Sequence, residues 1–176
     1  MNLVFTGFMG SGKTTIGKIA AEKLDRAFFD TDSMIEKSAG LSISGIFESS
    51  GEEAFRKIES ETVAAAAGMD DIVISCGGGV VTVPKNIEIL KKNGIIVNLF
   101  ASPEVLLERI SESGRRPLIA EASNPLGEIK KMLLKRAQAY TNCDFAFDTG
   151  GLSPAECAEE ILNGLNIACI LERGYK

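Results

Sequence analysis

The segment Gly7–Thr14 carries the pattern in this chain with the clearest chemical meaning. It reads Gly-Phe-Met-Gly-Ser-Gly-Lys-Thr and matches the phosphate-binding pattern GxxxxGK(S/T) in full. In such a loop the glycines let backbone N–H groups converge on phosphate oxygens, Lys13 neutralises the β- and γ-phosphates, and the Thr14 hydroxyl binds Mg²⁺. An apolar segment precedes the loop and helical spacing follows it, so we expect a nucleoside triphosphate here rather than an ordinary glycine-rich turn. The predicted nucleotide contacts in and beside the loop are Gly10, Ser11, Gly12, Lys13, Thr14 and Thr15.

Two carboxylates lie at the end of the predicted strand 27–30: Asp30 is its last residue, and Asp32 follows it closely. Ligands bind at the carboxyl ends of strands in open α/β sheets, so both side chains are expected near the nucleotide. One would hold Mg²⁺ through water, and the other would accept a proton from a substrate hydroxyl. The chain has no histidine, which leaves acid–base work to carboxylates. The alternative is structural, with Asp30 ending a strand and Asp32 only capping the next helix.

Three consecutive glycines, Gly77, Gly78 and Gly79, follow the apolar segment 71–75. Glycine loses more backbone freedom on folding than any other residue, so three in a row are costly if they only make a turn. The triplet favours close approach of a ligand to the backbone, with a plain flexible turn as the alternative.

Four arginines are candidate anion ligands, because guanidinium groups suit carboxylate and phosphate oxygens. They are Arg56, Arg115, Arg116 and Arg136. Arginine is also common on surfaces, so each one taken singly is better explained as a solvated surface residue.

The elements that must position these residues follow from hydrophobic periodicity and from helix-start signals. Strands are predicted over residues 2–6, 27–30, 71–75, 94–100 and 145–148. Helices are predicted over about 16–24, from Asp32 as N-cap, twice between 42 and 67 with the second starting near Gly51, and over 84–93, 103–113, 126–140 and 154–165. This alternation predicts a three-layer α/β/α fold with a five-stranded parallel sheet covered on both faces. The tail 166–176 stays unassigned.

Length and composition fit one domain over residues 1–176, with no low-complexity tract. The formal net charge of −5 argues against nucleic acid as a partner, because binding to its backbone relies on clustered lysine and arginine. No apolar run is long enough to span a bilayer, so we expect a cytoplasmic protein. The four cysteines form no CxxC pair, and without histidine they complete no zinc site, so structural burial is expected for each.

Taken together, the motifs resemble those of the shikimate kinase family in order and spacing along nearly the whole chain. The matching segments are Gly7–Thr14, Asp30-Thr31-Asp32, Gly51-Glu52-Glu53-Ala54-Phe55-Arg56, Gly77-Gly78-Gly79, Arg116-Pro117-Leu118, and Arg136 with Tyr140. The resemblance implies a P-loop fold of the nucleoside-monophosphate-kinase type, with a mobile lid at about 114–125 and a shikimate-binding helical region at about 31–62. It also implies transfer of the γ-phosphate of ATP to the 3-hydroxyl of shikimate, in aromatic amino-acid biosynthesis and with Mg²⁺.

The resemblance also implies roles for single residues. Asp32 would bind the shikimate hydroxyls and act as the base, while Arg56 and Arg136 would clamp the carboxylate. The backbone at Gly77–Gly79 would contact the ring hydroxyls. Arg116 would move with the lid onto the transferring phosphoryl group.

Charge that builds on the transferred group would be met by Lys13, Mg²⁺ and Arg116 as preorganised electrostatics. Thr14 and Asp30 are the predicted residues of the metal site. Closure of the lid would exclude water, which would otherwise allow hydrolysis of ATP to compete with transfer.

The chain departs from the family pattern in three places. The family often has proline between the clamp arginine and the tyrosine, whereas this chain has alanine, glutamine and alanine at 137–139. The adenine-contacting stretch, 149–154, lacks the usual arginine, so adenine would rest on backbone, on Pro154 or on Arg109. The lid carries Arg115 beside Arg116, and no role is assigned to Arg115.

Three other functions are compatible with part of the sequence. Another P-loop kinase, acting on gluconate or on a nucleoside monophosphate, would keep the loop and the lid but would not need Arg56 with Gly77–Gly79. A nucleotide-dependent switch is suggested only by 141–144, which is similar to the guanine-reading pattern (N/T)KxD but lacks its lysine. A catalytically weak binding homologue is disfavoured because each matched catalytic position is filled. A monomer is expected, because no heptad seam is present.

Overall fold

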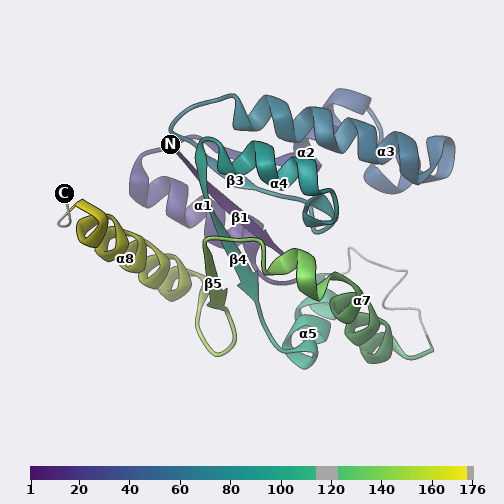
Figure 1. Ribbon diagram of the computed structural model, residues 1–176. Coiled ribbons are helices and arrows are strands. Elements are labelled where there is room, and N and C mark those ends of the chain that lie inside the picture. The colour runs from purple at the N-terminus through teal and green to yellow at the C-terminus, as the bar shows by residue number, and fades with distance from the viewer. Residues whose placement is uncertain (114–122, 174–176) are drawn as a thin grey trace.

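The computed structural model describes residues 1–113 and 123–173 of this chain. Five parallel strands form one sheet in the order β2-β3-β1-β4-β5 (Figure 1). The strands are β1 Asn2–Gly7, β2 Phe28–Asp30, β3 Val73–Ser75, β4 Gly94–Phe100 and β5 Phe145–Asp148. The helices are α1 Lys13–Leu24, α2 Thr31–Ala39, α3 Ile43–Ala67, the short 3-10 helix η1 Val80–Thr82, α4 Pro84–Lys91, α5 Pro103–Ser113, α7 Pro125–Tyr140 and α8 Pro154–Arg173.

Alternate residues of the central strands face opposite layers of helices, which confirms the predicted three-layer fold. On β1, Leu3 and Phe5 pack with α1 and α8, whereas Val4 packs with α3 and α4. Burial on both faces explains why these strands read as continuous apolar runs rather than alternating ones. A third cluster, in which α5 and α7 pack around Phe8, lies where the phosphate-binding loop leaves the sheet.

Helix boundaries differ from the prediction in two places. The N-cap of α2 is Asp30 rather than Asp32, because the Asp30 carboxylate accepts a hydrogen bond from the Ser33 amide at 3.1 Å. Asp32 therefore lies inside the first turn of the helix. Helix α8 continues past Leu165 to Arg173, so part of the unassigned tail is helical.

Helix α3 contains the break that was predicted near Gly51. This residue has φ +79° and ψ 176°, a backbone conformation that residues other than glycine rarely adopt. The break divides α3 into two helical segments, and the second of them carries Arg56.

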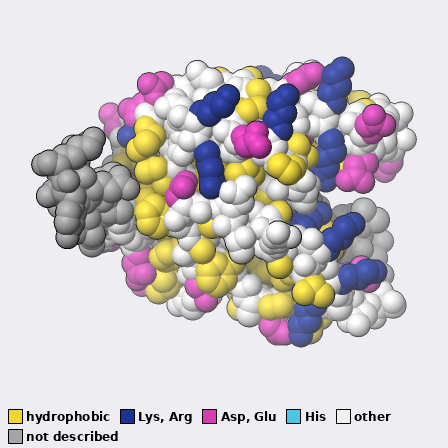
Figure 2. Space-filling view, in the orientation of Figure 1, with side chains coloured by type: hydrophobic (Ala, Val, Ile, Leu, Met, Phe, Trp, Pro, Cys, Tyr) yellow, Lys and Arg dark blue, Asp and Glu magenta, His cyan; other side chains and the backbone are white. Residues whose placement is uncertain are grey.

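Charged side chains of both signs are scattered over the face shown in Figure 2. On the face shown in Figure 2, lysine and arginine lie among aspartate and glutamate rather than forming one continuous basic surface. Within the described part of the chain, no helix combines the length and apolar character needed to cross a membrane.

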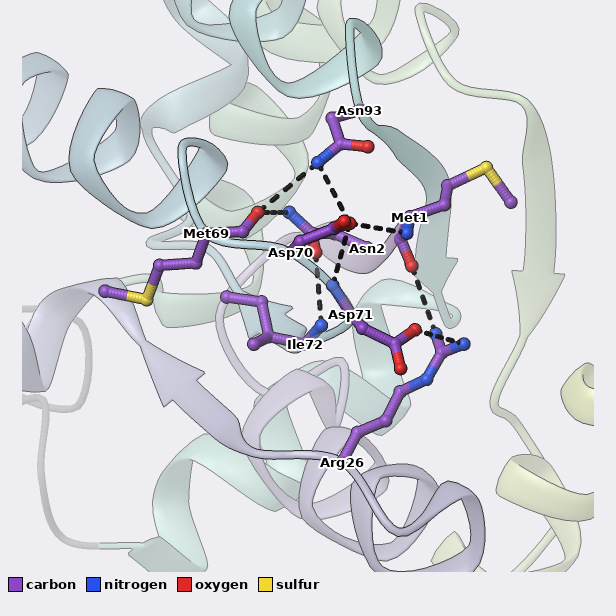
Figure 3. Close-up of polar contacts among 8 residues, drawn as sticks. All are labelled: Met1, Asn2, Arg26, Met69, Asp70, Asp71, Ile72 and Asn93. Atoms are coloured by element: carbon purple, nitrogen blue, oxygen red, sulfur yellow. Dashed lines mark hydrogen bonds and ion pairs between the residues drawn. The ribbon is translucent and has the colours of Figure 1, made fainter.

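The amino ends of the strands are joined by a network of polar contacts (Figure 3). Its centre is Asn2, which is 2% exposed; its amide donates to the Met69 carbonyl at 2.9 Å and accepts from the Ile72 N–H at 3.1 Å. Around it, the N-terminal ammonium pairs with Asp70 at 2.7 Å, and Arg26 pairs with Asp71 at 2.7 Å. At the amino ends of the strands, these polar groups therefore bond to one another. The predicted site residues lie at the other edge of the sheet, where the carboxyl ends of the strands meet.

The cysteines are partly as predicted. Cys76 and Cys157 are buried free thiols, but Cys143 is only half-buried, so full burial was wrong for that residue. Cys143 follows the C-terminal end of α7, where one side remains open to solvent. The side chain of Cys169 lies outside the described residues.

Candidate active site

The phosphate-binding loop is shaped by glycines whose conformations other residues would not tolerate. Gly10 and Gly12 have φ of +78° and +92°, and a Cβ at Gly7 would collide with the Leu99 carbonyl. Gly12 caps α1, so the first N–H groups of that helix face the loop. Lys13 is 8% exposed, and its Nζ donates to the Phe8 carbonyl at 2.9 Å, which holds the ammonium against the loop. The loop thus has the shape of an anion site before any phosphate binds.

Three oxygen-bearing side chains meet at the start of α1. The Thr14 hydroxyl donates to the Asp30 carboxylate at 2.8 Å and lies 3.4 Å from the Ser75 hydroxyl at the end of β3. Mg²⁺ prefers such hard oxygen donors, and it commonly takes only one or two protein ligands beside waters and substrate phosphates. Within the described ranges no group of three or more His, Cys, Asp or Glu side chains could hold a metal ion. The donors at Thr14 and Asp30 therefore fit the predicted ion.

The glycine triplet lies against two of the predicted substrate ligands. A Cβ at Gly77 would overlap the Asp32 carboxylate, and a Cβ at Gly79 would overlap the Arg56 guanidinium. The Gly77 N–H donates to the Thr31 hydroxyl at 2.9 Å, which fixes the triplet to the start of α2. The triplet is therefore more than a flexible turn, because the absence of side chains there makes room for Asp32 and Arg56.

Arg56 is held by a buried carboxylate that the sequence analysis did not identify. Its Nη1 donates to Glu59 at 2.7 Å, and Glu59 is 1% exposed; Glu52 adds a weaker pairing at 3.3 Å. Burial raises the pKa of Glu59, and the hydrogen bond from Arg56 opposes that rise. Burial lowers the pKa of Arg56, but the two glutamates outweigh it and the net shift is upward. The guanidinium thus stays charged and is fixed beside Gly79.

Helix α7 brings two side chains to one carbonyl of the triplet. Arg136 Nη1 and the Tyr140 hydroxyl donate to the Gly78 carbonyl at 3.3 and 3.1 Å. Burial raises the pKa of Tyr140, and the neighbouring Arg136 opposes this effect. The helix runs unbroken over 137–139, so the missing proline does not prevent arginine and tyrosine from reaching the same point.

One cavity of about 600 Å³ joins the phosphate-binding loop to this cluster. The predicted residues that line it are Gly10, Gly12, Lys13, Thr14, Thr15, Asp30, Asp32, Arg56, Gly78, Gly79, Arg109, Arg136 and Pro154. Ser11 and Gly77 do not line it: the Ser11 hydroxyl is buried next to Gly7, and Gly77 lies behind Asp32. Arg115 and Arg116, with 114–122 of the predicted lid, lie outside the described residues.

Several lining residues were given no individual role from the sequence, although Phe55 and Thr149 lie in stretches named above. Ile43, Phe47 and Phe55 form an apolar wall, with the two phenylalanine rings 4.6 Å apart. Cys76 also lines the cavity, and burial raises the pKa of its thiol, which therefore remains protonated. Thr149 lines the end where Arg109 and Pro154 lie. Single apolar or hydroxyl residues on helices and strand ends are indistinguishable in sequence from ordinary core residues.

The fold and the site define a class of protein. A preformed phosphate-binding loop opens into a cavity that also presents carboxylates, three guanidinium groups and an apolar wall. This is the arrangement of a P-loop kinase that phosphorylates a small, acidic, hydroxylated molecule.

Comparison with known proteins agrees with this class and narrows it. The family model described as shikimate kinase matches residues 9–166. Shikimate kinases of Caldicellulosiruptor bescii and Caldicellulosiruptor saccharolyticus are 44% and 46% identical to this chain over 162 residues, which cover 92% of it and 94% of each relative. A solved structure of shikimate kinase from Acinetobacter baumannii in complex with shikimate is 34% identical with a TM-score of 0.88, covering 99% of this chain and 95% of that one. The chain belongs to the shikimate kinase family.

Proposed function

We propose that this chain transfers the γ-phosphate of ATP to the 3-hydroxyl of shikimate, giving shikimate 3-phosphate and ADP. The observation that carries the proposal is that Asp32, Arg56 and Arg136 line the same cavity as Lys13 and Thr14. A phosphate donor and a small acidic acceptor are therefore accommodated next to each other, as direct transfer requires.

The acceptor end matches the chemistry of shikimate group by group. Shikimate has a carboxylate, three hydroxyls and a partly apolar ring. Arg56 and Arg136 supply charged donors for the carboxylate, Asp32 supplies an acceptor for the hydroxyls, and the wall of Phe47 and Phe55 suits the ring. Gluconate is a flexible open chain that would gain little from an apolar wall, so this wall favours shikimate over the gluconate alternative.

The chemical step is proposed as follows. Asp32 orients the attacking hydroxyl and accepts its proton late, while the bond between that oxygen and the γ-phosphorus forms and the bond to the β-phosphate oxygen breaks. Lys13 and the N–H groups at the start of α1 stabilise charge on the phosphoryl oxygens. We assign Arg116, on the lid at about 114–125, to the same charge when the lid closes.

Mg²⁺ is proposed as the cofactor, bound at Thr14 and, through water, at Asp30, with Ser75 close by. When bound, the ion neutralises phosphate charge. We further propose that residues 1–176 act as one kinase domain, with a shikimate-binding region at about 31–62, and as a monomer in the cytoplasm, where ATP is supplied.

The proposal is tested by a coupled assay of ADP release with Mg²⁺-ATP. The compared acceptors are shikimate, quinate, gluconate and nucleoside monophosphates. We expect strong stimulation by shikimate and at most weak stimulation by the others. Stimulation by another acceptor alone would retain the phosphate-binding loop and discard the Arg56–Arg136 clamp, and no stimulation by any acceptor would favour a binding role.

A further inference from the structure

We propose that Thr149 is a positioning residue that fixes the Arg109 guanidinium as a surface on which the nucleotide base stacks. The inference rests on the proposed use of ATP, and it adds the residue that immobilises Arg109, one of the side chains already expected at adenine. Thr149 follows β5 directly, is 1% exposed, and lines the cavity together with Arg109, Leu152 and Pro154. It supplies a fixed anchor in a stretch that lacks an arginine of its own.

Thr149 accepts hydrogen bonds from both terminal nitrogens of the Arg109 guanidinium. Its hydroxyl accepts from Arg109 Nη1 at 2.9 Å, and its carbonyl accepts from Arg109 Nη2 at 2.7 Å. The hydroxyl proton is itself used, because it is donated to the Phe100 carbonyl at 3.1 Å, to which the Thr149 N–H also donates at 2.8 Å. The donor and acceptor directions are therefore consistent, and Thr149 is fixed to the end of β4.

These two hydrogen bonds limit which part of the Arg109 guanidinium can still contact a ligand. Arg109 Nη1 also donates to the Gly10 carbonyl in the phosphate-binding loop at 3.4 Å. The edge of the guanidinium that carries Nη1 and Nη2 is therefore directed at protein acceptors. The flat face of a guanidinium stacks on aromatic rings, and Pro154, which begins α8 shortly after Thr149 in the chain, also lines the cavity. A side chain that is already immobilised loses little conformational entropy when a base binds, which favours affinity.

The test removes only the hydroxyl. Thr149→Val keeps the shape of the buried side chain and leaves Arg109 Nη1 without its 2.9 Å acceptor. Because a hydrogen bond to a charged group is lost, we expect the Kd of ADP and the KM of ATP to rise about tenfold. The Kd of inorganic tripolyphosphate, which uses the phosphate-binding loop but has no base, is expected to stay within about twofold, as are kcat and the KM of shikimate.

Two variants provide controls. Thr149→Ser keeps the hydroxyl and is expected to restore ADP binding to within about twofold of the parent, which a mere packing role would not do. Thr141→Val removes an exposed threonine hydroxyl that donates to the Gln138 carbonyl at the end of α7, and it is expected to leave both ligands unaffected.

An unchanged Kd of ADP in Thr149→Val would overturn the proposal. Equal weakening of ADP and tripolyphosphate would also overturn it, because Thr149 would then act through the loop. If Thr149→Val does not fold, Arg109→Lys tests the same contact, since lysine cannot fork two donors to Thr149, and an unchanged ADP affinity would again overturn it. These titrations with ADP and tripolyphosphate contain no phosphoryl acceptor. Their results can therefore be interpreted even if shikimate proves not to be the substrate.

Discussion

The proposed proton acceptor is a single side chain, Asp32, whose carboxylate lies against Gly77 at the cavity wall. We predict that Asp32→Asn lowers kcat at least about 100-fold, because asparagine can orient a hydroxyl but cannot take its proton. The KM of ATP should stay within about twofold, and thermal unfolding should show a folded protein. Asp25→Asn, at an exposed carboxylate after α1, is the matched control. Near-normal turnover of Asp32→Asn would remove its assignment as base.

Recognition of the acceptor's carboxylate is assigned to a different residue. We predict that Arg136→Ala raises the KM of shikimate by roughly 10- to 100-fold, because charge-assisted hydrogen bonds are lost. ADP binding, measured by titration calorimetry, should be nearly unchanged. Lys135→Ala removes an exposed neighbouring cation on α7 and should alter neither value. Loss of ADP affinity together with shikimate affinity would show that Arg136 acts on the whole cavity instead.

At the scale of elements, the break in α3 decides where Arg56 lies. A Cβ at Gly51 would meet no atom within 4 Å, so Gly51→Ala isolates the cost of its backbone conformation. We predict a loss of about 1–3 kcal/mol in the free energy of unfolding, measured in urea, together with a raised KM of shikimate as α3 straightens. Gly164→Ala, in the interior of α8 with equally open surroundings, should instead stabilise by about 0.5–1 kcal/mol. A Gly51→Ala variant as stable as the parent would show that the break is not imposed by glycine.

The elements with strong periodicity were predictable, because burial on both faces of β1 or one face of α5 leaves a clear pattern. Residues whose role depends on a distant neighbour were not. Glu59 reads as an ordinary helical surface residue, and only the structure shows that it is buried and paired with Arg56, its i,i+3 neighbour. The cap at Asp30 was misassigned to Asp32 because both carboxylates satisfy the N-cap preference, and only the hydrogen bond to Ser33 distinguishes them.

At the scale of the whole molecule, the site combines a negative net charge with a local group of cations. The chain carries a net charge of −5, yet Lys13, Arg56, Arg109 and Arg136 converge on one cavity that would receive two anionic substrates. Each of the four is held by protein acceptors: the carbonyls of Phe8, Thr149 and Gly78, and the carboxylate of Glu59. Among the described residues, the anion site is therefore arranged in advance by groups at the carboxyl edge of the sheet.

The amino edge of the sheet has the opposite task, because it stabilises the fold without touching the reaction. Asn2→Ala would leave the buried Ile72 N–H without its acceptor and would weaken the bonding of the Met69 carbonyl, which Asn93 also contacts at 3.3 Å. We predict a loss of about 2–3 kcal/mol and a Tm lower by roughly 5–10 °C. Activity at 25 °C should be unchanged, because the site lies at the other end of the strands.

Asn93→Ala is the matched control for this edge, since it deletes only two contacts of 3.3 Å from a half-buried side chain. It should lower Tm clearly less than Asn2→Ala. If Asn2→Ala instead changed the KM of shikimate or ATP while Tm stayed constant, a change at the amino ends of the strands would be affecting the cavity at their carboxyl ends. The two edges would then not be separable into a stabilising one and a catalytic one.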